Sequence, residues 1–276
     1  MAVTPVSIAL AGKFRILDKP GGRKTHRSTM PRGAGIVIWS GYLLWALFLP
    51  NPGVEVRLVA TGASLVFVVG YMDDMHPLPS LMRLLFHAAA ALWVVYTLPV
   101  PLWQRLLLTI WITGATSAYN FIDGMDGLCL IMTLLTMLMA AVFAGSPLIW
   151  IPLSGLVFGV FAWNFPSPRT FLGDGGSTLL GYICTSHLAW NVFPSFFQHG
   201  LFFMLAALLL LGGAPVLDTL IAMTRRILTR RSPFTPDRGH AHHKLLDAGI
   251  PKPLTILVIG CVHVFMLFSG YRFLGI

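Results

Sequence analysis

Carboxylate side chains gather in three short motifs of this sequence. Asp73 and Asp74 close an apolar run in GYMDDMHPL, and Asp174 opens the glycine-rich stretch GDGGST. The third motif, YNFIDGMDGL, places oxygen-bearing side chains at intervals of three residues: Asn120, Asp123 and Asp126. Only ten of the 276 residues are acidic, so half of them lie in these motifs. The motifs are therefore the first candidates for chemistry.

The motif YNFIDGMDGL has the residue types of a metal site. A spacing of three brings side chains to one face of a helical turn, and the glycines let a ligand approach the backbone. Amide and carboxylate oxygens are the ligands that Mg²⁺ prefers. The fragment DGMDG also resembles part of a calcium loop, but the twelve-residue spacing and its closing Glu are absent. The pattern therefore favours magnesium.

The other two motifs each allow a functional and a structural interpretation. On an ideal helix Asp73 and Asp74 point about 100° apart, so one carboxylate could face a metal or substrate while the other has a different partner. The pair could equally mark a helix end at the membrane surface. Asp174 precedes a predicted helix start, whose free backbone N–H groups would attract phosphate. A simple capping aspartate is the alternative for Asp174.

The longest polar stretch, residues 224–253, brings four candidate phosphate ligands within six residues: Arg238, His240, His242 and His243. Arginine and histidine side chains donate hydrogen bonds to phosphate oxygens. A zinc site is the rival interpretation, but the stretch has no cysteine and no fourth ligand at zinc spacing. Together with the carboxylates, these residues indicate phosphoryl transfer, in which cations neutralise the transferring phosphate and carboxylates hold the metal.

The composition is that of a membrane protein. Hydrophobic residues make up 56% of the chain and charged residues 11%, whereas a soluble domain has about a quarter charged residues. We expect an all-α fold, a polytopic transmembrane helical bundle that forms a single domain over residues 1–276. Nine segments come close to the length of about 20 apolar residues that spans a bilayer: 33–50, 57–72, 80–97, 106–122, 127–144, 147–165, 175–193, 200–223 and 254–272. The short segment before Asp18 is expected to lie at the interface or to be the tail of a helix whose beginning is missing.

The positive charges give the bundle an orientation. If the loops alternate between the two sides, sixteen of the nineteen Lys and Arg residues lie on one side. By the positive-inside rule that side is the cytoplasm. The same topology places every acidic residue except Glu55 at or near the cytoplasmic face. We therefore expect cytoplasmic catalytic loops, and we interpret the basic excess as a topology signal that does not call for nucleic acid as a partner.

Five motifs resemble, in order and spacing, the polyprenyl-phosphate N-acetylhexosamine-1-phosphate transferases of glycosyltransferase family 4. They are DKPGGRKTHRSTMPRGAG, GYMDDMHPLPSLMR, YNFIDGMDGL, FLGDGGSTLLGY and SPFTPDRGHAHHKLLDAG. The form PDRGHAHH is most similar to the undecaprenyl-phosphate GlcNAc-1-phosphate transferases. The resemblance implies a multi-pass enzyme of the bacterial inner (cytoplasmic) membrane. It would transfer HexNAc-1-phosphate, with GlcNAc favoured, from a UDP-sugar to undecaprenyl phosphate and release UMP, the first membrane step of making a surface polysaccharide such as O-antigen.

The resemblance also implies roles for individual residues. The metal, Mg²⁺ with Mn²⁺ as an alternative, would be bound by Asn120 and Asp174. Two pairs of carboxylates would be catalytic. Asp73 and Asp74 would lie beside the lipid phosphate, and Asp123 and Asp126 beside the nucleotide diphosphate. Substrate-binding residues would be Lys24 and His26 near the lipid phosphate, and Arg238, His240, His242 and His243 at the diphosphate and sugar.

Several alternatives stay open at this point. The donor could carry FucNAc or QuiNAc, and the enzyme could be a homodimer. A membrane transporter of an anionic solute would also use charged residues, but it predicts charges and broken helices near the bilayer midplane, whereas the charges here gather at one end. A non-catalytic scaffold predicts no metal-dependent chemistry. His187 and His263 lie in apolar segments outside the motifs, and we expect them to pack between helices.

Overall fold

A computed structural model describes residues 3–13, 17–18, 29–50, 52–196, 199–233 and 237–276. Lys24 and His26, both predicted to bind substrate, lie outside these ranges. Within them the elements follow in the order α1 (Thr4–Lys13), β1 (Leu17–Asp18), β2 (Met30–Pro31), α2 (Gly35–Phe48), α3 (Val54–Met75), α4 (Ser80–Val95), α5 (Leu102–Ile122), α6 (Leu128–Phe143), α7 (Pro147–Asn164), α8 (Gly173–Phe196), α9 (Leu201–Leu228), α10 (Ala241–Asp247) and α11 (Lys252–Leu274). The two short strands form one antiparallel pair.

The helices agree with the predicted apolar segments. In the part of the chain that the structure describes, each predicted segment coincides with one helix, from α2 to α9 and then α11. Four of them, α3, α7, α9 and α11, are long and apolar enough to cross a membrane, and α2, α4 and α6 are shorter apolar helices. The chain is therefore an all-α membrane protein, as predicted. The ten-residue α1 is the short N-terminal segment.

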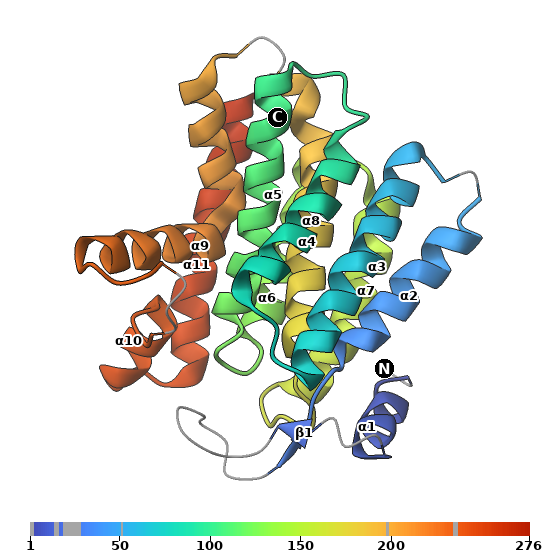
Figure 1. The fold of residues 1–276 in the computed structure, drawn as a ribbon, viewed down its shortest axis with the longest axis vertical. Coiled ribbons are helices and arrows are strands. Elements are labelled where there is room, and N and C mark those ends of the chain that lie inside the picture. The colour runs from blue at the N-terminus through green and yellow to red at the C-terminus, as the bar shows by residue number, and fades with distance from the viewer. Residues whose placement is uncertain (1–2, 14–16, 19–28, 51, 197–198, 234–236) are drawn as a thin grey trace.

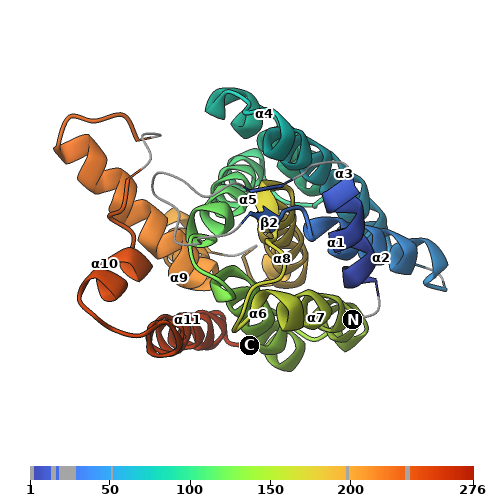
Figure 2. The same ribbon diagram turned by 90° about the horizontal axis from the view of Figure 1, so that it is seen from below.

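Helix α8 lies at the centre of the bundle, with α3 and α5 packed against it (Figures 1 and 2). Every residue from Gly175 to Ala189 is buried. The hydroxyls of Thr178 and Thr185 donate to backbone carbonyls four residues earlier, at 2.6 and 2.7 Å. Such bonds within the helix satisfy polar side chains without an outside partner, so a helix of modest hydropathy can be buried on all sides.

Helices α3 and α8 touch through glycines. A Cβ atom on Gly70 would lie 2.6 Å from Cα of Gly175, and a Cβ atom on Gly175 would lie 2.9 Å from the backbone nitrogen of Tyr71. Small residues at such a crossing let two backbones approach closely. The close approach brings the last turn of α3, with Asp73 and Asp74, against the first turn of α8.

Helix α9 is broken in its middle. Gly213 has φ 61° and ψ −159°, Pro215 follows two residues later, and the second half of α9 turns away from the bundle axis (Figure 1). Pro and Gly are the usual causes of such a break. The backbone N–H of Ala214 donates to Nδ1 of His263 on α11 at 3.1 Å. His263 thus packs between helices, as predicted, and satisfies a donor at the break.

A second buried histidine, His187, lies beside the beginning of α3, at the end opposite Asp73 and Asp74. Nδ1 of His187 is 2.5 Å from Oε1 of Glu55, and its Nε2 is 2.9 Å from the hydroxyl of Tyr42. We call these three residues the far-end network. It joins α2, α3 and α8, and its central ring is completely buried. His187 therefore also packs between helices, as predicted.

Candidate active site

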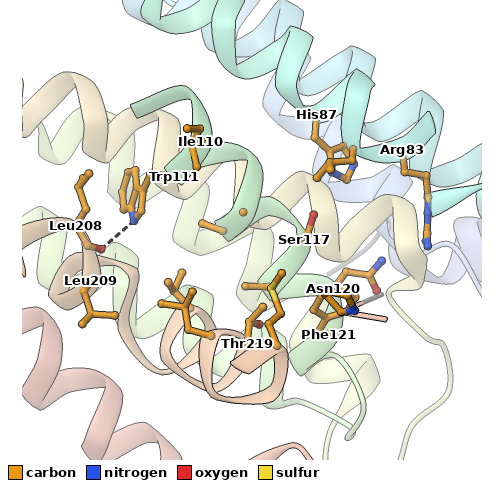
Figure 3. Close-up of a pocket in the computed structure, with 18 of the residues that line it drawn as sticks. Arg83, His87, Ile110, Trp111, Ser117, Asn120, Phe121, Leu208, Leu209 and Thr219 are labelled. Carbon is orange, nitrogen blue, oxygen red and sulfur yellow. Dashed lines mark hydrogen bonds between the residues drawn. The ribbon is translucent and has the colours of Figure 1, made fainter. Parts of the chain in front are cut away.

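Two cavities meet at the end of the bundle where α3 and α5 end and α8 begins. The polar pocket has a volume of about 300 Å³ and is lined by charged and amide side chains: Asp18, Arg32, Asn120, Asp123, Asp126, Asn164, Asp174 and His243. The apolar pocket has a volume of about 420 Å³ and lies between α4, α5 and α9 (Figure 3). Asn120 lines both pockets, so the two spaces adjoin at this side chain.

The side chain of Asp74 is fully buried and joins α3 to the start of α8. Its Oδ1 accepts the backbone N–H of Asp174 at 2.8 Å, and its Oδ2 accepts that of Gly175 at 3.1 Å. Nε of Arg32 lies 2.9 Å from Oδ1. A carboxylate is favourable at a helix N-terminus because the first N–H groups have no partner within the helix. Asp74 therefore caps α8 from a different helix.

Asp73 turns toward α4 instead. Its Oδ2 accepts a hydrogen bond from Nη1 of Arg83 at 2.5 Å, and its Oδ1 accepts the backbone N–H of Leu78 at 2.6 Å. Arg83 lines the apolar pocket, where it faces Asn120 across the cavity (Figure 3). The two neighbouring aspartates thus have separate surroundings, one under the start of α8 and one beside the apolar pocket.

Asp174 lies between two arginines. Nη2 of Arg32 is 2.5 Å from its Oδ1, and Nη1 of Arg83 is 3.3 Å from its Oδ2. Its carboxylate also interacts with the side chains of Asn120 and Asp73. The two predicted metal ligands, Asn120 and Asp174, are therefore adjacent in space although they lie on different helices.

Arg32 reaches these carboxylates because its loop pairs with the segment before α8. The backbone of residues 31–34 makes three hydrogen bonds to Phe171, between 2.8 and 3.1 Å. The loop that leads into α2 is thereby fixed beside the loop that leads into α8. Its arginine is placed between Asp74 and Asp174, where one positive charge offsets two buried carboxylates.

The loop after α5 supplies the other carboxylates of the polar pocket. Burial raises the pKa of Asp123 well above its usual value, and the nearby carboxylate of Asp174 raises it further. Oδ2 of Asp126 is 2.7 Å from Nζ of Lys252, which begins α11. Both predicted residues line the pocket. Burial is the main cause of this shift, and the neighbouring carboxylates add to it.

Two of the predicted histidines lie in or beside the polar pocket. His243 lines it directly. His240 is buried, and its Nδ1 is 2.7 Å from Oδ2 of Asp218 on the second half of α9. Oδ1 of Asp218 also accepts the backbone N–H of Ala241 at 2.9 Å, so this carboxylate fixes the start of α10. His240 is thus held by α9 and oriented by it.

The remaining two residues of this cluster are not placed as phosphate ligands. Arg238 is exposed and forms a 2.9 Å ion pair with Asp247. His242 is 1% exposed and lies beneath Gly124, and neither of its ring nitrogens has a hydrogen-bond partner in the described ranges. Burial lowers the pKa of His242 to about 3, and the neighbouring histidines contribute to the shift. The ring is therefore neutral at physiological pH.

Sequence comparisons relate the chain to known proteins. Residues 56–190 match the model of glycosyl transferase family 4. A probable undecaprenyl-phosphate N-acetylglucosaminyl 1-phosphate transferase of Bacillus subtilis (strain 168) is 31% identical over 94% of this chain and 77% of the relative. The chain belongs to glycosyl transferase family 4. Undecaprenyl-phosphate alpha-N-acetylglucosaminyl 1-phosphate transferases of Thermotoga maritima and Escherichia coli (strain K12) are 29% and 25% identical, over 93% and 91% of this chain and 81% and 74% of theirs.

Charged residues of this family member's site that were not predicted include Asp18, Arg32, Arg83 and Asp218. Arg83 gave a signal, since it is the only basic residue between Arg57 and Arg105. Asp218 gave one as well, because an acidic residue in an apolar helix is usually functional. Arg32 was hidden among the other basic residues of the N-terminal stretch, and only the pairing with the α8 segment distinguishes it.

The donor set of the polar pocket fits a magnesium ion. Among the described residues no three His, Cys, Asp or Glu side chains form a closed metal cage. Mg²⁺ usually takes only one or two carboxylates and completes its shell with water and substrate phosphates. Asn120 and Asp174 offer such a partial set at the pocket wall. The raised pKa of Asp123 is also the shift that a nearby divalent cation would reverse.

Proposed function

We propose that this family member transfers HexNAc-1-phosphate, with GlcNAc favoured, from a UDP-sugar to undecaprenyl phosphate and releases UMP. The names of its relatives give undecaprenyl phosphate and the transfer of an N-acetylglucosaminyl 1-phosphate group, which supports the acceptor and the transferred group. The observation that carries the proposal is the junction of an apolar pocket and a carboxylate-lined polar pocket at Asn120. A membrane-borne lipid phosphate and a water-soluble nucleotide sugar require two such spaces that share one wall.

The prenyl chain would occupy the apolar pocket with its phosphate toward Arg83. The walls of this pocket on α5 and α9 are joined by a 2.8 Å hydrogen bond from Nε1 of Trp111 to the carbonyl of Leu208 (Figure 3). Most of the other lining side chains near them are aliphatic, among them Leu107, Ile110 and Leu209. A guanidinium group at the end of an apolar channel suits a phosphate attached to a long hydrocarbon.

The lipid phosphate would be the nucleophile. One of its oxygens attacks the β-phosphorus of the UDP-sugar, the bond from that phosphorus to the bridging oxygen breaks, and UMP leaves with the electron pair. The second pKa of a phosphate monoester is about 6, so little base catalysis is needed. Asp73, beside Arg83, would accept the remaining proton and orient the phosphate. Asp74 would act as a positioning residue, since both of its oxygens are already bonded at the start of α8.

The diphosphate of the donor would lie in the polar pocket. Asn120 and Asp174 would hold Mg²⁺, with Mn²⁺ as an alternative, and the metal would neutralise charge on the diphosphate during transfer. Asp123 and Asp126 would position the nucleotide or diphosphate, and His243 would donate to it. His240, His242 and Arg238 would support the site without touching the diphosphate. Asp218 would hold His240 in place. Lys24 and His26 stay predicted contacts of the lipid phosphate.

The topology is part of the proposal. We infer that the described helices α2 to α9 and α11 all span the bilayer, and that the polar pocket faces the cytoplasm of a bacterium, within its inner membrane. The placement of sixteen of nineteen Lys and Arg residues on one side supports this orientation. The 276 residues would form one domain, and the product would be the lipid-linked sugar that starts a surface polysaccharide. A FucNAc or QuiNAc donor, and a homodimer, are compatible with the same site.

The direct test is to incubate the purified protein with undecaprenyl phosphate, Mg²⁺ and a panel of UDP-sugars and to measure UMP. We expect UMP release that needs both the lipid and the metal, fastest with UDP-GlcNAc. A folded protein that releases no UMP from any of these sugars would refute the assignment.

An anionic-solute transporter is the second candidate, because α9 is broken at Gly213 as a transporter helix would be. The nearby backbone N–H of Ala214 is bonded to His263, however, and so is not presented to a solute. Uptake of the labelled UDP-sugar into sealed vesicles without UMP formation would favour this candidate over the transferase.

A further inference from the structure

His87 on α4 is buried, with 3% of its surface exposed, yet neither ring nitrogen has a hydrogen-bond partner in the ranges that the structure describes. A buried polar group without a partner is unfavourable and calls for an explanation. The other two histidines within long helices differ sharply from it. His187 and His263 are fully buried, and both ring nitrogens of each are bonded.

His87 lines the apolar pocket, on the same face of α4 as Arg83 (Figure 3). The two residues are four apart, which places His87 about 6 Å farther along the helix axis from the acidic end. Ser117 on α5 lines the facing wall, and its hydroxyl donates to the carbonyl of Thr113 on its own helix at 3.2 Å. The imidazole of His87 is thus a hydrogen-bonding group that faces a largely hydrocarbon cavity, about one helical turn along α4 from Arg83.

The ligand that fits this arrangement has negative charge at Arg83 and acceptor oxygens within reach of the next turn. A phosphate monoester on a hydrocarbon chain meets both conditions, because its oxygens accept hydrogen bonds and its chain fills the rest of the pocket. A neutral imidazole always carries one N–H donor. Resting on the proposed function, we propose that His87 donates a hydrogen bond to a phosphate oxygen of the prenyl phosphate acceptor and so sets how deeply its head group enters the pocket.

This role makes a prediction that a structural role does not. Replacing an unsatisfied buried polar group by an apolar one of similar size is neutral or stabilising for the empty protein. We therefore expect H87L to have a melting temperature no lower than that of the wild type. Its apparent KM for prenyl phosphate should rise about tenfold or more, as expected for the loss of one hydrogen bond to a charged group. The KM for the UDP-sugar should not change.

Two further variants serve as controls. H87Q keeps an N–H donor of similar reach and should retain most of the affinity for the lipid phosphate. Y271F removes another buried hydroxyl without a described partner, on α11, which does not line the pocket, and should leave the lipid KM unchanged. An equal rise in KM for Y271F, or an unchanged lipid KM in H87L, would overturn the role of His87.

A binding measurement separates this inference from the proposed function. Farnesyl phosphate should raise the melting temperature of the wild type and of H87Q much more than that of H87L, and farnesol, which lacks the phosphate, should not distinguish the three. If the wild type releases no UMP but shows this pattern, the transferase proposal fails and the phosphate contact stands. If UMP is released but farnesyl phosphate stabilises H87L and the wild type equally, the contact is wrong and the function stands.

Discussion

Helix α3 carries carboxylates near both of its ends, and each end is joined to α8 in a different way. Near its beginning, Glu55 bonds to His187, whose other nitrogen is bonded to Tyr42, so the ring of the far-end network is enclosed and satisfied. At its other end, Asp74 caps α8 while its neighbour Asp73 bonds to Arg83, which lines the apolar pocket. Both ends stabilise the same pair of helices, but only the second also lines space for a ligand.

The difference shows how a structural polar contact can be told from a functional one in this molecule. In the far-end network each titratable group is hydrogen-bonded to a side chain of another helix. At the site end, burial and then the neighbouring Asp174 raise the pKa of Asp123, and two arginines contact several carboxylates. Crowded charge beside a cavity is costly for the empty protein, which suggests a ligand that offsets it.

The largest effect should follow from changing Asp174 at the site end. Asp174→Asn keeps the shape of the side chain but removes the charge that would hold the metal. We expect UMP release to fall by more than about 100-fold, the upper range for losing a group that only supports a metal ligand. The measurement is turnover at saturating Mg²⁺ and substrates, with the melting temperature as a check on folding. Near wild-type turnover would show that Asp174 is not a ligand.

Asp74→Ala should damage stability and turnover together. It leaves Nε of Arg32 and two backbone N–H groups of α8 without their acceptor, although Arg32 keeps its contact with Asp174, and losing one partner of a buried ion pair costs about 3–5 kcal/mol. Asp73→Ala is the matched control. It should lower turnover comparably while reducing the melting temperature less, because Asp73 caps no helix. If Asp73→Ala lowered the melting temperature more than Asp74→Ala, Asp73 would be the structural residue and Asp74 the catalytic one.

The fold was largely predictable, because an apolar stretch of membrane length has few alternatives to a helix. The break of α9 was not predicted, although Gly213 and Pro215 lie within its apolar run. Breaks depend on a neighbour that satisfies the freed backbone group, and here that neighbour is His263 on α11. Local sequence shows the glycine and the proline but not the histidine that meets them.

The composition of the site was predicted better than the roles within it. The predicted topology put the motifs of Asn120, Asp123 and Asp174 at one face of the membrane, and in the structure the three residues line one pocket. Asp73 and Asp74 have different partners, and this difference depends on contacts with α8, 100 residues away in the chain. The burial of His242 under Gly124 likewise arises from tertiary packing, which residue types alone do not reveal.

Glu55→Gln sharpens the comparison from the far end. Glutamine can still accept a hydrogen bond from His187, so the expected loss is about 1 kcal/mol, the value of a typical hydrogen bond. Turnover and both KM values should stay within about twofold of wild type, because distant sites act independently. The measurement is the melting temperature together with steady-state kinetics. A turnover loss comparable to that of Asp74→Ala would mean that the two ends of α3 are coupled.

The last comparison concerns pH and should also arise at the site end. The pKa of His242 in the folded protein is about 3, lowered by burial and by its neighbours, whereas an unfolded histidine has a pKa of about 6.5. Between these values the unfolded state binds more protons, so stability is full above pH about 6.5 and is lost as the pH falls toward 3.

His242→Phe keeps an aromatic ring beneath Gly124 and removes this titration. The other groups near the ring, His240, His243 and Asp218, are unchanged in the variant. We expect the melting temperature of the wild type to fall more between pH 7 and about 4.5 than that of the variant. Parallel pH profiles would show that His242 is not the source of the acid sensitivity. A smaller acid loss in the variant would assign part of the acid sensitivity to His242 at the site end of the molecule.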